Sequence, residues 1–380
     1  MASAAARRRD APDPVLFNVV LALIVVGLAA VFSASFARSL DLSRIQNDAY
    51  FLLKRQAVFA VFGVVAMLGM MRVGYWRLRA WAVPLLFLSL VLLLLVWVPG
   101  IGLTRNGAAR WIGWGPAQIQ PSEIAKLALM IYLAALLSRG NLRIQDFWDG
   151  LFAPLCVIGV FFLLIEREPD MGTAFVLGLA SLVVLYAAGA RKRHLAAVMG
   201  VAFLGFVCLT LTHGFRVERL ITFVRPDADP LGSGYQIRHG ILAVGSGGIL
   251  GMGIGAGREK FYLPEASTDF IFATIAEEAG LVGSLVVIGL LLTLARQGFA
   301  IARRTRDRFG SLLATGISAL ISCQAVVNIA VVTASIPATG VPLPFISSGG
   351  TSLVFMLCGV GILLNISQHP DAACRDSARR

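Results

Sequence analysis

The sequence predicts an all-α fold, a polytopic membrane protein with ten transmembrane helices. Apolar runs recur along the 380-residue chain, and a run of about twenty apolar residues crosses the roughly 30 Å hydrocarbon core of a bilayer as a helix. Hydrophobic residues make up 57% of the chain and charged residues 14%, against about 25% charged in soluble domains. Runs such as 83–98 and 281–295 lack the alternation of barrel strands, so helices must satisfy the backbone in lipid.

The ten predicted spans are residues 15–36, 55–71, 80–98, 121–138, 151–165, 172–190, 195–212, 270–295, 310–333 and 350–366. They form one transmembrane domain, 15–367, between an N-terminal tail, 1–14, and a C-terminal tail, 368–380. The first span follows a basic segment and precedes Ser33-Ala34-Ser35, as a cleavable signal peptide would. Because its apolar run is longer than that of a usual signal peptide, we expect an uncleaved anchor.

Basic residues collect in alternate connections of this arrangement. With the N-terminus in the cytoplasm, the inner side holds the basic stretches 7–9, 77–79, 191–193 and 303–308. Enrichment of Lys and Arg in short cytoplasmic loops orients membrane proteins, so both termini are predicted inside. The net charge of +12 then reflects topology and contact with anionic membrane lipid, and we predict no nucleic-acid partner.

Three connections on the predicted outer side are unusual. Residues 213–269 form a large extracytoplasmic loop between the seventh and eighth spans, too apolar for a solvated coil. We expect one or two amphipathic or re-entrant helices there, packed over the outer mouth of the bundle, with glycines at 245–257 permitting close backbone approach. Residues 99–121 are expected to form a smaller loop, and 334–349, with three prolines, a rigid cap.

Charged residues at the starts of predicted helices are the first candidates for chemistry. Glu123 and Lys126 open the fourth span, Asp170 opens the sixth, and Asp269 stands where the long loop re-enters the membrane. Asp170 and Asp269 could simply cap their helices, while Ser122 could cap the fourth span and Glu123 could pair with Lys126. Alternatively, these groups face an anionic headgroup, and partial burial raises the pKa of Asp269 towards that of a general base.

Two further acids, Glu277 and Glu278, lie inside the eighth span. An intramembrane acid needs a partner, and Gln324 and Asn328 on the ninth span are the expected partners. We interpret this group as a contact between helices, with proton transfer as the alternative. The five cysteines and four histidines are scattered, so a protein-built metal centre is not predicted.

The position of these charges favours one class of function. They line the outer mouth of the predicted bundle, which suits an anionic lipid headgroup handled at the outer leaflet. A proton-coupled transporter would instead place charges and broken helices near the midplane. The chain contains no P-loop, zinc motif or nucleophile elbow, so any reaction must use an already activated substrate.

Four motifs connect the chain to a known family: QPSEIAKL at 120–127, EPDMGT at 168–173, YLPEASTDFIF at 262–272 and PLPFISSGGTS at 342–352. Together they resemble the SEDS family (shape, elongation, division and sporulation), which includes FtsW, RodA and SpoVE. The resemblance covers about residues 15–367 and is nearer to FtsW and SpoVE than to RodA. Two positions depart from the family pattern, since Ser267 stands where His is frequent and Ser348 where Tyr is usual.

The resemblance implies a peptidoglycan glycosyltransferase that polymerises lipid II at the outer face of the bacterial cytoplasmic membrane and releases undecaprenyl pyrophosphate. It assigns the catalytic base to Asp269, while cations must stabilise the leaving pyrophosphate. The candidate substrate-binding residues are Glu123, Lys126, Asp170, Arg110, Arg216, Arg219 and Arg258. No cofactor is implied as certain, although Mg²⁺ or Mn²⁺ bridging pyrophosphate to Asp269 or Asp170 would fit the chemistry.

The resemblance also implies partners and leaves alternatives open. A class B penicillin-binding transpeptidase is the expected partner, in contact around the eighth and ninth spans, together with other divisome or elongasome membrane proteins. The alternatives are a lipid II flippase, which is a transporter, and a non-catalytic scaffold of the wall-synthesis complex. Division, elongation and sporulation roles are not separated by the sequence.

Overall fold

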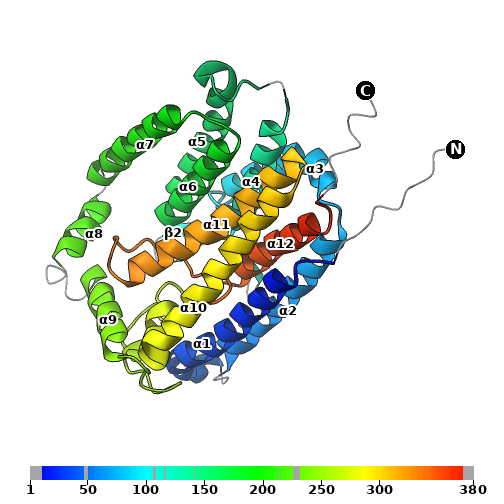
Figure 1. Cartoon of the computed structure of the whole chain (residues 1–380). Coiled ribbons are helices and arrows are strands. Elements are labelled where there is room, and N and C mark those ends of the chain that lie inside the picture. The colour runs from blue at the N-terminus through cyan, green and yellow to red at the C-terminus, as the bar shows by residue number, and fades with distance from the viewer. Residues whose placement is uncertain are drawn as a thin grey trace.

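The structure is a computed structural model that describes residues 11–46, 50–105, 108–114, 117–140, 142–212, 214–225 and 232–370. Residues 1–10 and 371–380, in the two predicted tails, lie outside the described residues. Helices dominate the described part (Figure 1). They are α1 (Pro14–Gln46), α2 (Phe51–Arg72), α3 (Trp76–Leu95), α4 (Pro121–Leu137), η1 (Phe147–Leu151), α5 (Phe152–Arg167), α6 (Met171–Ala187), α7 (Lys192–Thr212), α8 (Gly214–Val224), α9 (Ser233–Ser246), η3 (Glu259–Phe261), α10 (Ile271–Arg304), α11 (Arg308–Val332) and α12 (Gly350–Ser367).

Most of these helices have the length and composition of membrane spans. Among the described residues, seven helical segments are long and apolar enough to cross a bilayer: α1 over Pro14–Ser35, α2, α3, η1 with α5, α10, α11 and α12. The other three predicted spans correspond to α4, α6 and α7, of which α4 and α6 have 17 residues each. The prediction of a helical, multi-pass membrane protein is confirmed.

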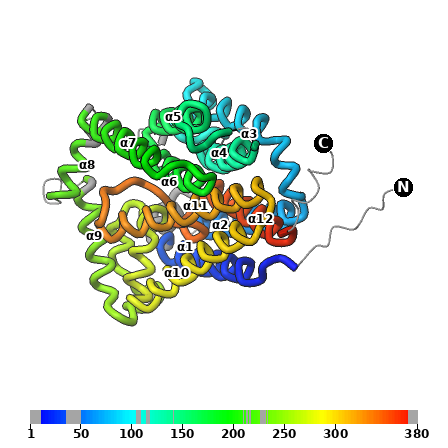
Figure 2. Tube along the Cα trace, turned by 45° about the horizontal axis from the view of Figure 1, so that its top comes forward, coloured from blue at the N-terminus to red at the C-terminus, as the bar shows by residue number. Residues whose placement is uncertain are grey.

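Alternate connections gather at opposite ends of the bundle. At one end, the Asp13 amide bonds Ser367, the Tyr75 amide bonds Asn365, and Arg308 donates to the Ala188 carbonyl. This end therefore joins the start of α1, the α2–α3 and α6–α7 connections and the end of α12. The other end carries α8 and α9, as both views show (Figures 1 and 2), and the strand β2 lies towards that end in Figure 1.

The connection between α3 and α4 folds differently from the prediction. It forms a three-stranded antiparallel sheet of β1 (Gly102–Arg105), β2 (Ala108–Trp114) and β3 (Ala117–Ile119), in the order β1-β2-β3. The strictly all-α prediction is wrong here. The missed signal was the Asn-Gly dipeptide at 106–107, outside the described residues, because such dipeptides favour tight hairpin turns.

The described part of the long 213–269 connection contains two short α-helices, as expected, and the 3₁₀ helix η3. Both α8 and α9 lie at the end of the bundle that carries the sheet (Figure 1). After α9, the chain approaches the backbone of α10 so closely that a Cβ on Gly247 or Gly251 would lie 1.9 or 2.1 Å from a carbonyl oxygen of α10. The expected role of glycines in this segment is confirmed.

An interruption in α10 makes this close approach possible. Gly280 has φ 65° and ψ −162°, outside the helical region, where a residue with a side chain would be strained. The amides of Met252 and Gly253 donate to the carbonyls of Glu277 and Glu278. The segment after α9 thus supplies the hydrogen bonds that α10 loses at its break, as irregular backbone at membrane depth requires.

The predicted partners of the two acids in α10 are wrong. Glu278 accepts hydrogen bonds from the Lys260 ammonium at 2.8 Å and from Ser33. Glu277 accepts the backbone amides of Arg258 and Glu259. The acids face the returning loop and α1, because the break at Gly280 brings that loop against this face of α10.

Candidate active site

Asp269 lies two residues before α10, at the end of the bundle that carries the sheet. The N-cap position of α10 is Phe270, with no side-chain cap hydrogen bond, so capping does not explain the aspartate. Its side chain is half-buried, and its carboxylate makes no hydrogen bond within the described part of the chain, although its backbone carbonyl does. A carboxylate held in place and left without a protein partner can accept a proton from a bound substrate.

The electrostatic surroundings suit Asp269 to that task. Burial raises the pKa of Asp269 to about 7, and the negative charges of Glu265 and Asp170 act in the same direction. The guanidinium groups of Arg110 and Arg219 oppose that rise. A base whose pKa lies near neutrality combines a useful ionised fraction with proton affinity. Three residues distant in sequence, Asp170, Arg110 and Arg219, thus act on Asp269 together with the nearby Glu265.

Asp170 has a structural role and also faces this group. Its Oδ1 accepts the Thr173 amide at 3.3 Å as the N-cap of α6, and its Oδ2 accepts from Gln120 Nε2 at 3.1 Å. The capping interpretation is therefore correct for Asp170. It does not exclude a role in the site, because the charge of Asp170 also acts on Asp269.

Two arginines reach the site from different elements. Arg110, on β2, donates from Nε to the Glu168 carbonyl at 3.1 Å and from Nη2 to the Pro169 carbonyl. Arg219, on α8, donates from Nη1 to the Ala338 carbonyl at 3.1 Å. Burial lowers the pKa of Arg219, and the positive charge of Arg110 adds to that effect. Backbone carbonyls thus hold the mutually repelling guanidinium groups of Arg110 and Arg219 at this end of the bundle. Two such cations favour the binding of an anionic ligand.

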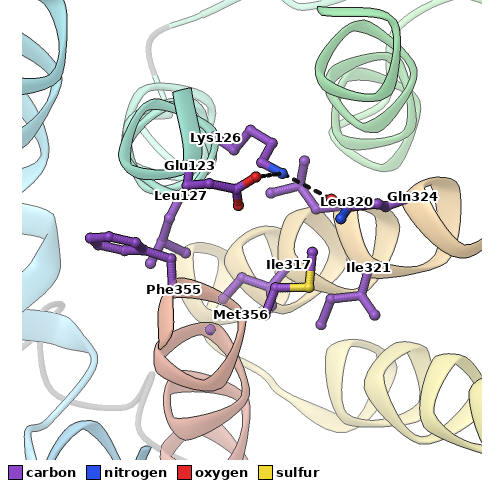
Figure 3. Close-up of a pocket in the computed structure, with 10 residues that line it drawn as sticks. Glu123, Lys126, Leu127, Ile317, Leu320, Ile321, Gln324, Phe355 and Met356 are labelled. Carbon is purple, nitrogen blue, oxygen red and sulfur yellow. Dashed lines mark hydrogen bonds and ion pairs between the residues drawn. The ribbon is translucent and has the colours of Figure 1, made fainter. Parts of the chain in front are cut away.

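Lys126 occupies a separate, buried position. Its ammonium donates to Glu123 Oε1 and to Gln324 Oε1, both at 2.8 Å. Figure 3 shows these three side chains converging between α4 and α11. They border a cavity of about 30 Å³ whose other lining is mostly apolar, which is room for water but not for a sugar. The predicted pair of Glu123 and Lys126 is present.

The remaining candidates are less closely associated with Asp269. Arg258 is exposed, and its backbone amide bonds Glu277 rather than any residue at the mouth. Arg216 belongs to α8, and its side chain lies outside the described residues. The structure therefore brings together Asp269, Asp170, Arg110 and Arg219 and places Arg258 elsewhere.

Two further acids at this end of the bundle, Glu265 and Glu168, were not among the candidate site residues of the sequence analysis. Glu265 provides the largest charge effect on Asp269. Glu168 is fully buried, and neither of its carboxyl oxygens has a partner in the described residues. Burial raises the pKa of Glu168 to about 9, and the charge of Asp170 adds to the rise. Both acids are in the quoted motifs, so the motifs themselves were the available signal.

The described residues contain no group of three or more His, Cys, Asp or Glu side chains placed to hold a metal ion. The four cysteines in this part of the chain are free thiols. A cation at the mouth would need ligands from a bound substrate in addition to protein carboxylates.

The fold and the site together define a multi-pass helical membrane protein with an acid–arginine site at one mouth of its bundle. A family model described as "Cell cycle protein", which covers FtsW, RodA and SpoVE, matches residues 14–372. The chain belongs to this family, which confirms the resemblance inferred from its four motifs.

Individual relatives match along almost their whole length. Stage V sporulation protein E of Bacillus subtilis is 42% identical over 363 residues, which cover 95% of this chain and 98% of that protein. The probable peptidoglycan glycosyltransferase FtsW of Trichlorobacter lovleyi is 43% identical over 356 residues, covering 93% of each.

Solved structures agree with the fold. One chain comes from a structure titled as a peptidoglycan synthase complex that coordinates polymerization and crosslinking, with a TM-score of 0.79, 30% identity and coverage of 95% of this chain and 99% of that one. The rod shape determining protein RodA of Thermus thermophilus has a TM-score of 0.71 at 29% identity, covering 95% of this chain and 98% of that one.

Proposed function

We propose that this chain is a peptidoglycan glycosyltransferase that polymerises lipid II at the outer face of the bacterial cytoplasmic membrane. The main support is Asp269, a half-buried carboxylate with a pKa raised to about 7, beside the cations Arg110 and Arg219. The names of relatives along the full chain support the same activity.

The proposed topology has ten spans with both termini in the cytoplasm. The segregation of alternate connections to two ends of the bundle supports it. The basic stretches 77–79, 191–193 and 303–308 belong to connections at the end opposite Asp269. Because basic loops stay in the cytoplasm, the mouth with Asp269 then faces outward.

The proposed reaction joins two sugars. A hydroxyl of the acceptor attacks the anomeric carbon of the donor, and its proton passes to the carboxylate of Asp269. The bond from that carbon to the pyrophosphate oxygen breaks, and the electron pair leaves with undecaprenyl pyrophosphate. Arg110 and Arg219 would stabilise the developing charge. A single base with inversion at the sugar needs no covalent intermediate.

A divalent cation remains part of the proposal. Asp269 and Asp170 carry oxygen ligands of the kind that Mg²⁺ prefers, and the pyrophosphate would supply others. Such an ion would neutralise the leaving group. In the structure, Asp170 accepts hydrogen bonds from Gln120 and Thr173.

The proposed partner is a class B penicillin-binding transpeptidase. The fold similarity to a chain from a peptidoglycan synthase complex supports such an assembly. Contact through the lipid-facing surfaces of α10 and α11, the predicted eighth and ninth spans, fits their exposed apolar side chains, among them Leu285, Leu292 and Val326. Other division or elongation proteins of the membrane would join this assembly.

Transport of lipid II is the second candidate. The buried group of Glu123, Lys126 and Gln324 favours it, because transporters place polar residues inside the bundle. The cavity beside that group, about 30 Å³, gives no path for a headgroup in this conformation. The polymerase is therefore the better-supported function.

Polymerisation of labelled lipid II by the purified protein with its transpeptidase partner tests the proposal. Asp269→Ala should abolish glycan chains. Asp149→Ala, an exposed aspartate in η1, is the matched control and should polymerise normally. Undiminished product from Asp269→Ala would refute the base assignment. Growth supported by Asp269→Ala in cells would indicate a scaffold.

A further inference from the structure

Three consecutive backbone carbonyls before α10 each accept a hydrogen bond from a distant part of the chain. The Ser267 carbonyl accepts from the Ser348 amide at 2.8 Å, and the Thr268 carbonyl from the Ser347 hydroxyl at 2.6 Å. The Asp269 carbonyl accepts from Asn328 Nδ2 at 2.8 Å. The backbone that carries the candidate base is thus held from outside its own helix.

Asn328 connects the backbone at Asp269 with the backbone at Val341. It lies fully buried on α11, and its Nδ2 also donates to the Val341 carbonyl at 2.7 Å. One turn earlier on α11, Gln324 Nε2 donates to the Pro342 carbonyl at 3.0 Å. Two amide side chains on one helix face therefore fix the 341–342 backbone, and one of them also fixes Asp269.

Ser347 holds the loop of residues 341–347, between α11 and α12, in shape. Its hydroxyl accepts the Leu343 amide at 2.7 Å while donating to the Thr268 carbonyl. Losing one of these donors would leave a partly buried carbonyl without its hydrogen-bond partner, which destabilises this backbone conformation. Among the described residues, no hydrogen bond holds the carboxylate of Asp269 itself, so the backbone determines its position.

We propose that Asn328 is a positioning residue for Asp269, acting with Ser347 as a clamp on the backbone of residues 267–269. This inference rests on the proposed function and adds residues that the motif comparison did not assign. The amide of Asn328 sets the place of the base by holding its carbonyl. The clamp takes no part in proton transfer and touches no substrate.

The clamp also accounts for two departures from the family pattern. Ser267 contributes its carbonyl and Ser348 its amide, and neither contact depends on the side chain. A different side chain at either position therefore leaves the backbone contacts possible. The aspartate stays in place although His and Tyr are replaced.

Asn365 offers a matched control for the test. It is also a fully buried asparagine, its Nδ2 donates to the Met71 carbonyl at 2.7 Å, and its Oδ1 accepts the Tyr75 amide at 2.8 Å. It lies on α12 at the opposite end of the bundle. Loss of its amide should lower stability as loss of Asn328 does, without moving Asp269.

The experiment compares Asn328→Ala and Asn365→Ala in the complex with the partner, using labelled lipid II. We expect Asn328→Ala to lower kcat by about 10²-fold per folded molecule with KM unchanged, since a small misplacement of a reacting group has that effect. Asn365→Ala should keep both constants and lose only thermal stability. Equal kcat for the two variants would overturn the inference.

A milder variant covers the case in which Asn328→Ala does not fold. Ser347→Ala removes one hydroxyl and should show the same pattern, a lower kcat at unchanged KM, with a smaller loss. Normal kcat in Ser347→Ala would count against the clamp. An inactive wild-type complex would instead contradict the proposed function itself, so the two failures are distinguishable.

Discussion

Asp269, just before α10, and Glu278, within its first turns, are both sheltered acids, yet their surroundings differ. Glu278 lies about two turns into the helix and is paired with the Lys260 ammonium at 2.8 Å. Lys260 also donates to Ser33 and to the Gly255 carbonyl. Asp269 has charged neighbours but no hydrogen bond to its carboxylate within the described residues.

This difference separates an acid that holds the fold from an acid that is available for chemistry. The hydrogen-bonding capacity of the Lys260 ammonium is used by Ser33, Gly255 and Glu278, so this pair joins η3, α1 and α10. Removing one partner of such a buried pair leaves an uncompensated charge, so the pair acts on stability. The Asp269 carboxylate can still bind a proton or a substrate hydroxyl, because no donor in the described part of the chain occupies it.

The largest effect should come from removing the charge of Asp269 while keeping its shape. We expect Asp269→Asn to lower polymerisation of lipid II by about 10²–10⁴-fold, the usual contribution of a general base. Thermal unfolding in detergent should not occur earlier, since no partner of the carboxylate is lost. A clear fall in the unfolding temperature would show that the two acids do not differ as described.

The Lys260–Glu278 pair should respond in the opposite way. Lys260→Met leaves a buried carboxylate unpaired, which costs about 3–5 kcal/mol of stability, whereas replacing both partners with apolar residues can be neutral. We therefore expect Lys260→Met to unfold at lower temperature and Lys260→Met with Glu278→Leu to recover. Activity per folded molecule should stay near wild type in the double variant. If the double variant recovered neither stability nor activity, the result would contradict a structural role for the Lys260–Glu278 pair.

The smallest effect concerns the dependence of activity on pH. A base must be deprotonated to work, so kcat should fall as the pH decreases below the Asp269 pKa of about 7, by about tenfold for each pH unit. Glu265→Gln removes the nearby charge that raises this pKa most. The midpoint of the acid limb should then move to lower pH. A midpoint that stays in place would assign the titration to another group.

Much of the fold followed from composition and local pattern. The long apolar runs predicted the membrane-spanning helices, and the density of apolar residues in 213–269 predicted the short helices α8 and α9. The sheet at 102–119 was missed because its strands are short and only the Asn-Gly turn signalled it. The four sequence motifs indicated Asp269 and Asp170 as site residues. They did not indicate that Lys126 would border a separate cavity.

The sequence by itself determined which segments are long and apolar enough to cross a membrane, because transfer of a side chain into lipid depends mainly on the residue's own chemistry. It also determined that an acid lies just before α10. The tertiary structure decided which buried polar groups meet: Lys260 with Glu278, and Asn328 with the Asp269 carbonyl. Helices that are apolar on all sides carry little information about which face meets which neighbour. Such long-range contacts arise only when the helices pack.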